Sequence, residues 1–150
     1  MLFNGSYERS IDAKQRLAIP SQVRHEIDRE KAGPTLFAVV LQVQGPTLCL
    51  YTENDFRRLA ELLDDSTKPA EEILQFEQVF FASARRVDID KQGRIRLPEQ
   101  LLEMAELKND VVLLGVKDHL EVHDRLRWTQ QRQQMLADNP KLMINPRLMR

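Results

Sequence analysis

The chain lacks the features that mark several classes of protein. It has one cysteine, Cys49, in 150 residues, which excludes an internal disulfide and a zinc site built from several cysteines. It also lacks a candidate membrane helix, because the longest stretch without charge includes residues 34–52 and is interrupted by Gln42, Gly45 and Pro46. With five glycines and seven prolines, the chain is neither collagen-like nor of low complexity. We therefore expect a folded protein with no membrane span.

The N-terminal residues carry no apolar core of the kind that a secretory signal needs. Glu8 and Arg9 stand where that core would lie, so we expect no signal peptide. Together with the single cysteine, this favours a cytoplasmic protein. Hydrophobic residues make up 42% and charged residues 30% of the chain, a balance typical of globular domains. The length of 150 residues suits one ordinary domain or two half-sized units.

Motifs for catalysis and for cofactor binding are missing as well. There is no Gly-x-Ser-x-Gly elbow, no Gly-x-x-x-x-Gly-Lys phosphate loop and no paired-histidine zinc motif. His119 and His123 are four residues apart, but in an extended segment their Cα atoms would be separated by roughly 13 Å. Cys49 lies in an apolar segment, where a buried, unreactive thiol is the ordinary outcome. We therefore expect no enzyme, with no catalytic residue, no metal ligand, no cofactor and no small-molecule substrate.

Charge is present but unevenly distributed. The net charge is only −1, which argues against a non-specific coat for nucleic acid. Residues 79–98 nevertheless carry five basic and two acidic side chains, and residues 125–150 carry six and one. Residues 53–78 carry three basic and eight acidic side chains. A chain of this kind can be nearly neutral overall and still present a strongly basic face.

An internal repeat is the most informative feature of the sequence. Residues 11–20 (IDAKQRLAIP) lie over residues 89–98 (IDKQGRIRLP) at an offset of 78. Both copies read apolar, Asp, three residues, Arg, apolar, any residue, apolar, Pro. At an offset of 72, Leu48, Leu50 and Phe56 correspond to Leu120, Val122 and Trp128. The repeat therefore spans whole half-chains.

Each half is predicted to contain the same elements. The alternation of apolar residues and the positions of Pro, Gly and capping residues predict two short strands, a brief helix, two apolar strands and a closing helix. The strands are expected over residues 7–11, 16–19, 36–43, 48–52, 111–116 and 120–123, and the closing helices after Thr52 and from about Asp124. The units are a first repeat (1–64), a linker with an amphipathic helix that carries Ile73, Phe76 and Phe80 (65–81), a second repeat (82–137) and a loose basic tail (138–150).

The duplicated Asp-x-x-x-Arg motif falls on the turn between the first two strands of each half. Asp12 and Asp90 are expected to structure the turn by accepting backbone N–H bonds. Gly93 suits a position with positive φ, and Gln15 holds that position in the first copy at a cost of about 1 kcal/mol if the geometry is the same.

The arginines of the motif are candidate ligand contacts. Arg16 and Arg94 each stand among further basic residues of the two turns, namely Arg9, Lys14, Arg85, Arg86, Lys91 and Arg96. Guanidinium groups on a β-ribbon can contact phosphates and, in the major groove, the acceptor edge of guanine. A purely structural alternative stays open, in which Arg16 only pairs with Asp12.

The start of the chain resembles the MraZ family of bacterial transcriptional regulators, which consist of two SpoVT/AbrB-type units. Residues 1–7 (MLFNGSY) and 11–20 carry this resemblance, and residues 90–98 and 111–116 (VVLLGV) are similar to the same family. The resemblance implies an α+β fold, a tandem swapped-hairpin β-barrel with peripheral helices, whose two pseudo-symmetric halves imitate a dimer. It also implies a ring-like homo-oligomer at the nucleoid. Its partner would be double-stranded DNA, at tandem repeats upstream of the division and cell-wall gene cluster, usually as a repressor.

Site residues follow from the resemblance by position. Asp12 with Arg16, and Asp90 with Arg94, occupy the two Asp-x-x-x-Arg motifs, so both arginines become candidate DNA contacts. The candidates for phosphate neutralisation are Lys14, Lys91, Arg9 and Arg96. Gln15 departs from the glycine that the family usually has. The competing hypothesis is an antitoxin-like protein-interaction module of the same fold, in which the tail 138–150 captures a partner.

Overall fold

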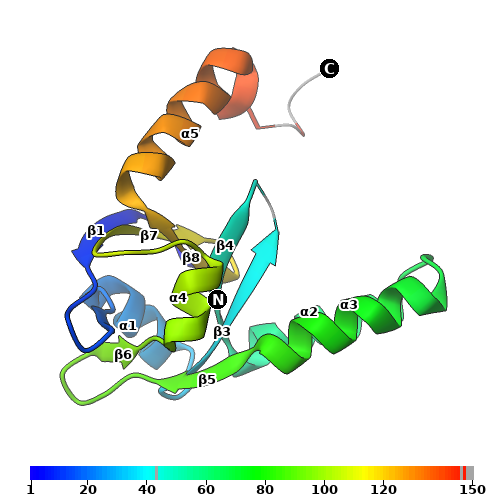
Figure 1. Cartoon of the computed structure of the whole chain (residues 1–150), viewed down its shortest axis with the longest axis horizontal. Coiled ribbons are helices and arrows are strands. Elements are labelled where there is room, and N and C mark those ends of the chain that lie inside the picture. Colours follow the sequence, from blue (N-terminus) through cyan, green and yellow to red (C-terminus); the bar gives the residue numbers. More distant parts are fainter. Residues whose placement is uncertain (43, 146, 148–150) are drawn as a thin grey trace.

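The computed structural model describes residues 1–42, 44–145 and 147 (Figure 1). The first half contains β1 (Ser6–Ser10), β2 (Arg16–Ala18), α1 (Ser21–Arg29), β3 (Thr35–Gln42), β4 (Pro46–Thr52) and α2 (Glu53–Asp64). Helix α3 (Ala70–Ser83) lies between the halves, and the second half contains β5 (Arg85–Asp88), β6 (Arg94–Arg96), α4 (Glu99–Met104), β7 (Asp110–Val116), β8 (His119–Asp124) and α5 (Arg125–Asp138). A short 3₁₀ turn, η1 (Pro140–Met143), follows α5. The predicted α+β class is confirmed.

The strands form two antiparallel sheets to which both halves contribute. The larger sheet has the order β1-β7-β8-β4-β3-β5, and the smaller is a two-stranded ribbon of β2 and β6. Only the β3–β4 and β7–β8 pairs join strands of the same half. The other pairs, β1–β7, β2–β6, β3–β5 and β4–β8, join one half to the other.

The first two strands, β1 and β2, are joined by the expected turn but pair with strands of the other half. The sequence predicted a tight turn between residues 7–11 and 16–19, and the turn is present, with the Asp12 N–H donating to the Arg16 carbonyl at 3.1 Å. Beyond the turn, β1 leaves for β7 and β2 leaves for β6. The local pattern identified both strands but not their partners, because side-chain alternation says nothing about which strand lies alongside.

The main core lies between the inner face of the larger sheet and the elements that cover it. Alternate residues of the sheet strands, such as Leu50 and Leu113, are fully buried on this face. Helix α1 adds Val23 and Ile27, α4 adds two leucines, and the ribbon adds Leu17 and Ile95. Burial of each of these side chains contributes about 1.5–3 kcal/mol, so the ribbon is held to the body by its apolar face.

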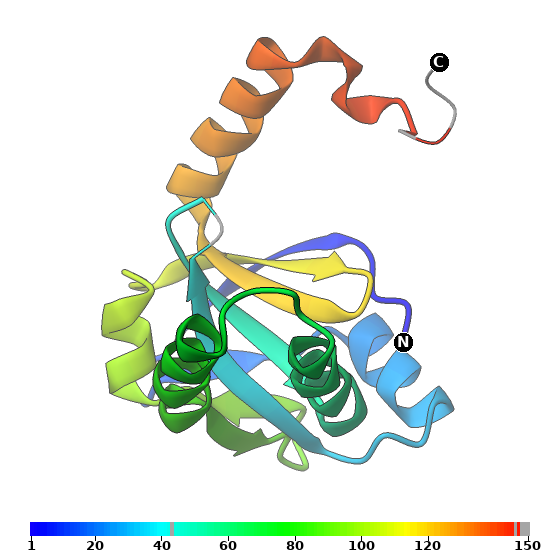
Figure 2. The same ribbon diagram turned by 90° about the vertical axis from the view of Figure 1, so that its right-hand side faces the viewer.

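Aromatic packing attaches α2 and α3 to the outer face of the sheet. The two helices lie side by side against β3 and β4 (Figure 2). The Phe56 ring stacks on Phe37 at a centroid distance of 4.7 Å and also contacts Phe80 and Phe81. Helix α2 begins at the predicted capping pair, since the Thr52 hydroxyl accepts from the Asp55 N–H. The amphipathic helix predicted between the halves is α3.

The second closing helix, α5, projects away from the body (Figure 1). Its N-cap is Asp124, as expected, whose carboxylate accepts from the Arg127 N–H. Arg125 attaches it to β1 by donating to the Arg9 carbonyl at 3.0 Å. Of the predicted tail, Pro146 and residues 148–150 lie outside the described residues, as does Val43 of the predicted strand 36–43.

Two smaller findings concern helix starts and membrane segments. The prolines that end the two motif copies, Pro20 and Pro98, occupy the N-cap positions of α1 and α4, where extended backbone precedes the first turn. None of the helices described in residues 1–42, 44–145 and 147 has the length and apolar character needed to cross a bilayer.

The interleaved pairing predicts that neither half folds alone as a monomer. Residues 1–67 keep only the β3–β4 hairpin of the larger sheet, and a lone hairpin is marginally stable in water. Circular dichroism and native mass measurement on residues 1–67, residues 68–150 and their mixture test this. The native spectrum should return only on mixing or through self-association of a fragment. A folded monomeric fragment would contradict the role assigned to the inter-half pairs.

Candidate nucleic-acid interface

The ribbon of β2 and β6 brings the arginines of the two motifs together. Its register places Arg16 opposite Arg96, Leu17 opposite Ile95 and Ala18 opposite Arg94. Leu17 and Ile95 are buried in the core. Because strand side chains alternate, all three arginines lie on the opposite, outward face. One surface therefore carries three guanidinium groups, contributed by both halves.

The first turn is organised by a carboxylate. Asp12 Oδ1 accepts the backbone N–H groups of Lys14 and Arg16, each at 2.9 Å, and Oδ2 accepts from Arg16 Nε at 2.8 Å. The hydrogen bond from the Arg16 N–H is the main reason that the pKa of the Asp12 carboxyl is lowered. Because this pKa is lowered, the ionised carboxylate stabilises the turn fully at any pH above the ordinary carboxyl pKa. The stabilisation is lost as the pH falls through the lowered pKa.

The second turn repeats this arrangement. Asp90 Oδ1 accepts the backbone N–H groups of Gln92 at 2.8 Å and Arg94 at 3.0 Å. The Arg94 N–H is again the main cause of a lowered pKa, here of the Asp90 carboxyl. Arg94 Nε lies 3.8 Å from Asp90 Oδ2, and its terminal group donates to Gln92 Oε1. Both acids thus occupy the turn-structuring positions that the motif predicts for them.

Backbone hydrogen bonds between the halves join the two turns into one unit. Ile19 N–H donates to the Gly93 carbonyl, and Leu97 N–H donates to the Gln15 carbonyl, each at 2.8 Å. The residues whose carbonyls accept have matching positive φ values, 78° at Gly93 and 65° at Gln15. Gln15 therefore takes the backbone conformation of its glycine counterpart.

The side chains of the two motif arginines are partly exposed, although Arg94 Nε itself is buried. The side chain of Arg16 is 31% exposed and that of Arg94 is 28% exposed. Within the described residues, the terminal nitrogens of Arg16 make no hydrogen bond, since Asp12 engages only Nε. Asp12 therefore orients the Arg16 guanidinium through Nε and leaves its two terminal nitrogens without a partner among the described residues.

The other basic candidates are distributed around this surface. Lys14, Lys91 and Arg96 are exposed on the turns and the ribbon. Arg86 of β5, together with Arg96 and Gln15, lines a cleft of about 390 Å³ beside the first turn. Arg9 lies apart from them, on β1 of the larger sheet, where its guanidinium donates to the Glu8 carbonyl and lies 5.8 Å from the Tyr7 ring centroid.

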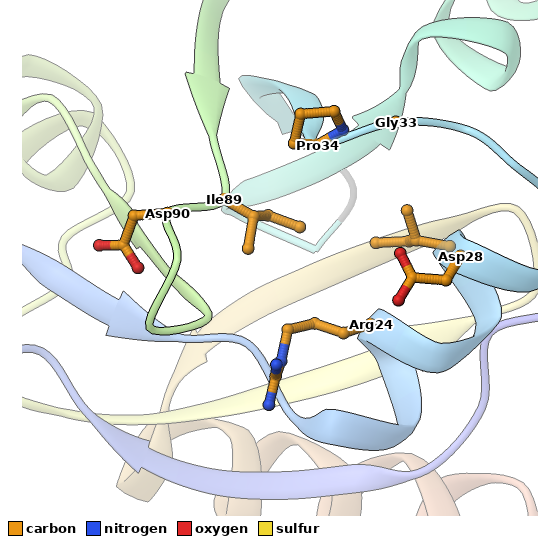
Figure 3. Close-up of a pocket in the computed structure, with 7 residues that line it drawn as sticks. Arg24, Asp28, Gly33, Pro34, Ile89 and Asp90 are labelled. Atoms are coloured by element: carbon orange, nitrogen blue, oxygen red, sulfur yellow. The ribbon is translucent and has the colours of Figure 1, made fainter.

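The sequence reasoning missed Arg24. This residue of α1 donates to the Ile19 carbonyl at 3.1 Å, and its guanidinium covers Gly93 so closely that a Cβ there would lie 2.8 Å from Arg24 Cζ. With Asp28 and Asp90 it lines a cleft of about 280 Å³ beside the second turn (Figure 3). At the repeat offset of 78, Arg24 corresponds to Leu102. The arginine is not repeated in the second copy, so the internal repeat did not point to it.

Comparison with known proteins places the chain in a family. The transcriptional regulator MraZ of Acetivibrio thermocellus is 33% identical to it over 129 residues, which cover 85% of this chain and 84% of that protein. The chain belongs to the MraZ family. The transcriptional regulator MraZ of Pediococcus pentosaceus is 35% identical over 127 residues, with the same two coverages. A family model described as "MraZ protein, putative antitoxin-like" matches residues 80–144, most of the second half. The resemblance seen in the sequence motifs is confirmed.

Replacing Gln15 with glycine should raise the free energy of unfolding by up to about 1 kcal/mol. The left-handed backbone at Gln15 costs a residue with a side chain about 1–2 kcal/mol, and glycine adopts it freely but loses about 0.5–1 kcal/mol more backbone entropy on folding. Lys91→Gly is the matched control, because Lys91 is an exposed turn residue with no left-handed backbone to relieve, and it should lower stability. Chemical denaturation of both variants measures the difference. Equal destabilisation by the two changes would show that Gln15 carries no strain.

Proposed function

We propose that this MraZ-family chain is a transcriptional regulator without enzymatic activity that binds double-stranded DNA sequence-specifically through the β2–β6 ribbon and its two turns. The observation that carries the proposal is the ribbon register, with Arg16 opposite Arg96 and Arg94 on the same outward face. The names of the relatives from Acetivibrio thermocellus and Pediococcus pentosaceus support the regulatory role. A nearly neutral chain needs such a local basic surface to bind a polyanion.

Arg16 and Arg94 are assigned the base contacts. A two-stranded ribbon fits the major groove, where a guanidinium fork donates to O6 and N7 of guanine. Asp12 engages Arg16 Nε and leaves the terminal nitrogens for that fork. Lys14, Lys91 and Arg96 would neutralise phosphates and set the register of the ribbon on the duplex. Arg9, on the larger sheet, would add only flanking phosphate contacts.

The proposal extends to the architecture and the target. Four strand pairs between the halves support a swapped-hairpin β-barrel in which the halves imitate a dimer. A ring-like homo-oligomer would place several ribbons along tandem DNA repeats, so that weak contacts multiply through effective concentration. The proposed target is the set of repeats upstream of the division and cell-wall gene cluster, with repression as the outcome.

Arginine substitutions should weaken specific binding more than substitution of a turn lysine. Arg16→Ala and Arg94→Ala should each cost about 1–3 kcal/mol of binding free energy, because each removes a base contact. Lys14→Ala should mainly reduce the slope of log K against log salt by about one. Fluorescence anisotropy across a salt series, with DNA from upstream of the chain's own gene and a scrambled duplex, measures both effects.

Controls separate this proposal from its competitor. Arg57→Ala is the matched control, since Arg57 is an exposed arginine of α2, which packs against β3 and β4, and it should bind like the parent. Removal of residues 139–150 should leave DNA binding intact, whereas an antitoxin-like module would lose its protein partner on this deletion. If both motif variants bind the upstream DNA like the parent, the assignment of the ribbon is wrong.

A further inference from the structure

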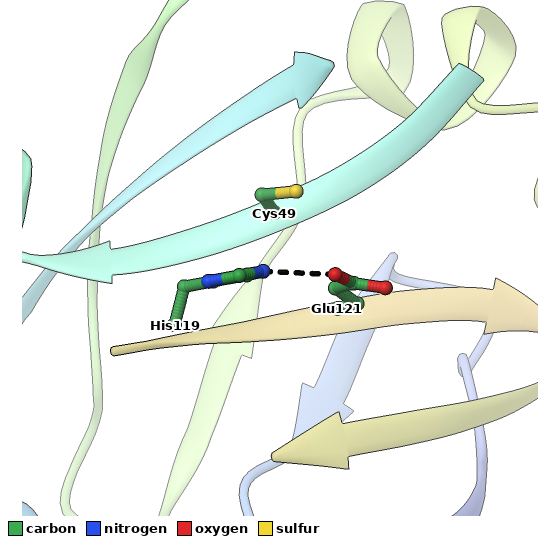
Figure 4. A group of neighbouring side chains, drawn as sticks. All are labelled: Cys49, His119 and Glu121. Carbon is green, nitrogen blue, oxygen red and sulfur yellow. Dashed lines mark hydrogen bonds and ion pairs between the residues drawn. The ribbon is translucent and has the colours of Figure 1, made fainter. Parts of the chain in front are cut away.

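A second group of polar side chains lies on the outer face of the larger sheet, remote in sequence from the two turns. Strands β4 and β8 are neighbours there, and their register places Cys49 opposite Glu121. His119 lies two residues before Glu121 on the same face of β8 (Figure 4). One nitrogen of His119, one oxygen of Glu121 and Cys49 Sγ all lie within 4.8 Å of one another.

We propose that Cys49, His119 and Glu121 form a binding site for Zn²⁺. Thiolate, imidazole and carboxylate are the three side-chain ligands that zinc takes in proteins, and their mixture suits zinc better than a hard cation such as Mg²⁺. Three protein ligands with a water molecule in the fourth position complete a tetrahedral site. In such a site neighbouring ligand atoms are about 3.4 Å apart. The 2.8 Å edge between His119 Nε2 and Glu121 Oε2 would therefore lengthen, and the edges to Cys49 Sγ, which are at most 4.8 Å, would adjust by about 1 Å.

The neighbours of the three ligands hold them as outer-shell partners do in metal sites. His119 Nδ1 is hydrogen-bonded to Asp118 Oδ1 at 2.8 Å, which leaves Nε2 to face the proposed metal. Glu121 Oε1 is hydrogen-bonded to His123 Nε2 at 2.8 Å, which leaves Oε2 on the side of His119. A carboxylate behind a metal-binding histidine fixes its ring orientation and makes it a better donor.

Ring stacking restricts the site further. The Tyr51 ring of β4 stacks on His119 at a centroid distance of 5.2 Å. On the other side, the Trp128 ring of α5 packs against His123 at 4.9 Å. Both imidazoles are therefore held before any ion arrives, which lowers the ordering cost of binding.

Access and proton balance are compatible with entry of an ion. Cys49 is fully buried, but the side chains of His119 and Glu121 are 17% and 15% exposed, so two of the three ligands are partly accessible to solvent. On binding, the Cys49 thiol loses its proton to solvent and forms the sulfur–metal bond. The Nε2–Oε2 hydrogen bond of 2.8 Å between His119 and Glu121 opens, and its proton also passes to solvent.

The proposed site departs from the expectation of no metal ligand, and its ligands differ from the His119–His123 pair that the sequence offers. His119 and His123 are both in strand β8, so the two rings do not converge as they would on a helix. The partner that completes the triangle is Cys49, from the neighbouring strand and the other half of the chain. A metal there would tie β4 to β8, the pair that joins the halves at the centre of the sheet.

Cobalt provides a direct test on the full-length chain without any histidine tag. One equivalent of Co²⁺ should give a thiolate-to-cobalt charge-transfer band in the near ultraviolet and should saturate at one ion per chain. Zn²⁺ should displace the cobalt and raise the melting temperature, because a ligand that binds only the folded state stabilises it. Absence of the charge-transfer band in the parent chain overturns the proposal whatever the variants do.

Variants assign the ligands. Cys49→Ser should abolish the charge-transfer band, and Glu121→Gln should weaken the zinc-induced rise in melting temperature. Asp118→Asn should lower zinc affinity by about 10- to 100-fold, as loss of an outer-shell partner does, while the sulfur band remains. His25→Gln is the matched control, since His25 is exposed on α1. A zinc-induced rise in melting temperature that survives Cys49→Ser would show that zinc binds elsewhere and would overturn the site. Variants that fold but lose stability, with no response to metal in the parent chain, would show a hydrogen-bonded cluster only.

Discussion

Backbone pairing between the two halves of the chain is the constraint on which the rest of the structure depends. Four of the six strand pairs join one half to the other. The same exchange produces the candidate interface, because each Asp-x-x-x-Arg turn connects a strand of the larger sheet with a strand of the ribbon. The Gly93 and Gln15 carbonyls then accept N–H groups from the opposite half. The basic surface therefore exists only when both halves are folded together, and the fold and the interface cannot be separated.

Duplication within one chain has let the two copies of this surface differ. Ala18 of the first copy corresponds to Arg96 of the second, Gln15 corresponds to Gly93, and Arg24 corresponds to Leu102. A dimer of identical units would carry the same residue at both places. The ribbon of this chain has Ala18 opposite Arg94 but Arg16 opposite Arg96, so its two ends are chemically different. On the proposed function, such a surface would favour DNA sites that are not perfect palindromes.

What the sequence could predict was local, and what it missed was long-range. The repeat, the alternation of apolar residues and the capping pair at Thr52 predicted nearly every element, because these signals depend on residues a few positions apart. The role of Asp12 in its turn is equally local, since its hydrogen-bond partners are two and four residues away. Partner strands, the cover that Arg24 forms over Gly93 and the approach of Cys49 to Glu121 depend on burial summed over the whole chain. The periodic pattern of apolar residues in one sequence carries no information about such long-range contacts.

The energetics of the ribbon indicate that its arginines are not there for stability. Arg16 stands directly opposite Arg96, and like charges at such a position destabilise a strand pair. Three residues on each strand give few ladder hydrogen bonds, so the ribbon depends on buried Leu17 and Ile95 and on the two hydrogen bonds between the turns. Asp12 and Asp90 offset part of the repulsion, but both carboxylates are exposed, where an ion pair contributes about 0–1 kcal/mol. On the proposed function, a polyanion offsets the charge that this surface gathers at a cost to its own strand pair, and duplex DNA supplies phosphates at the spacing that a two-stranded ribbon can follow.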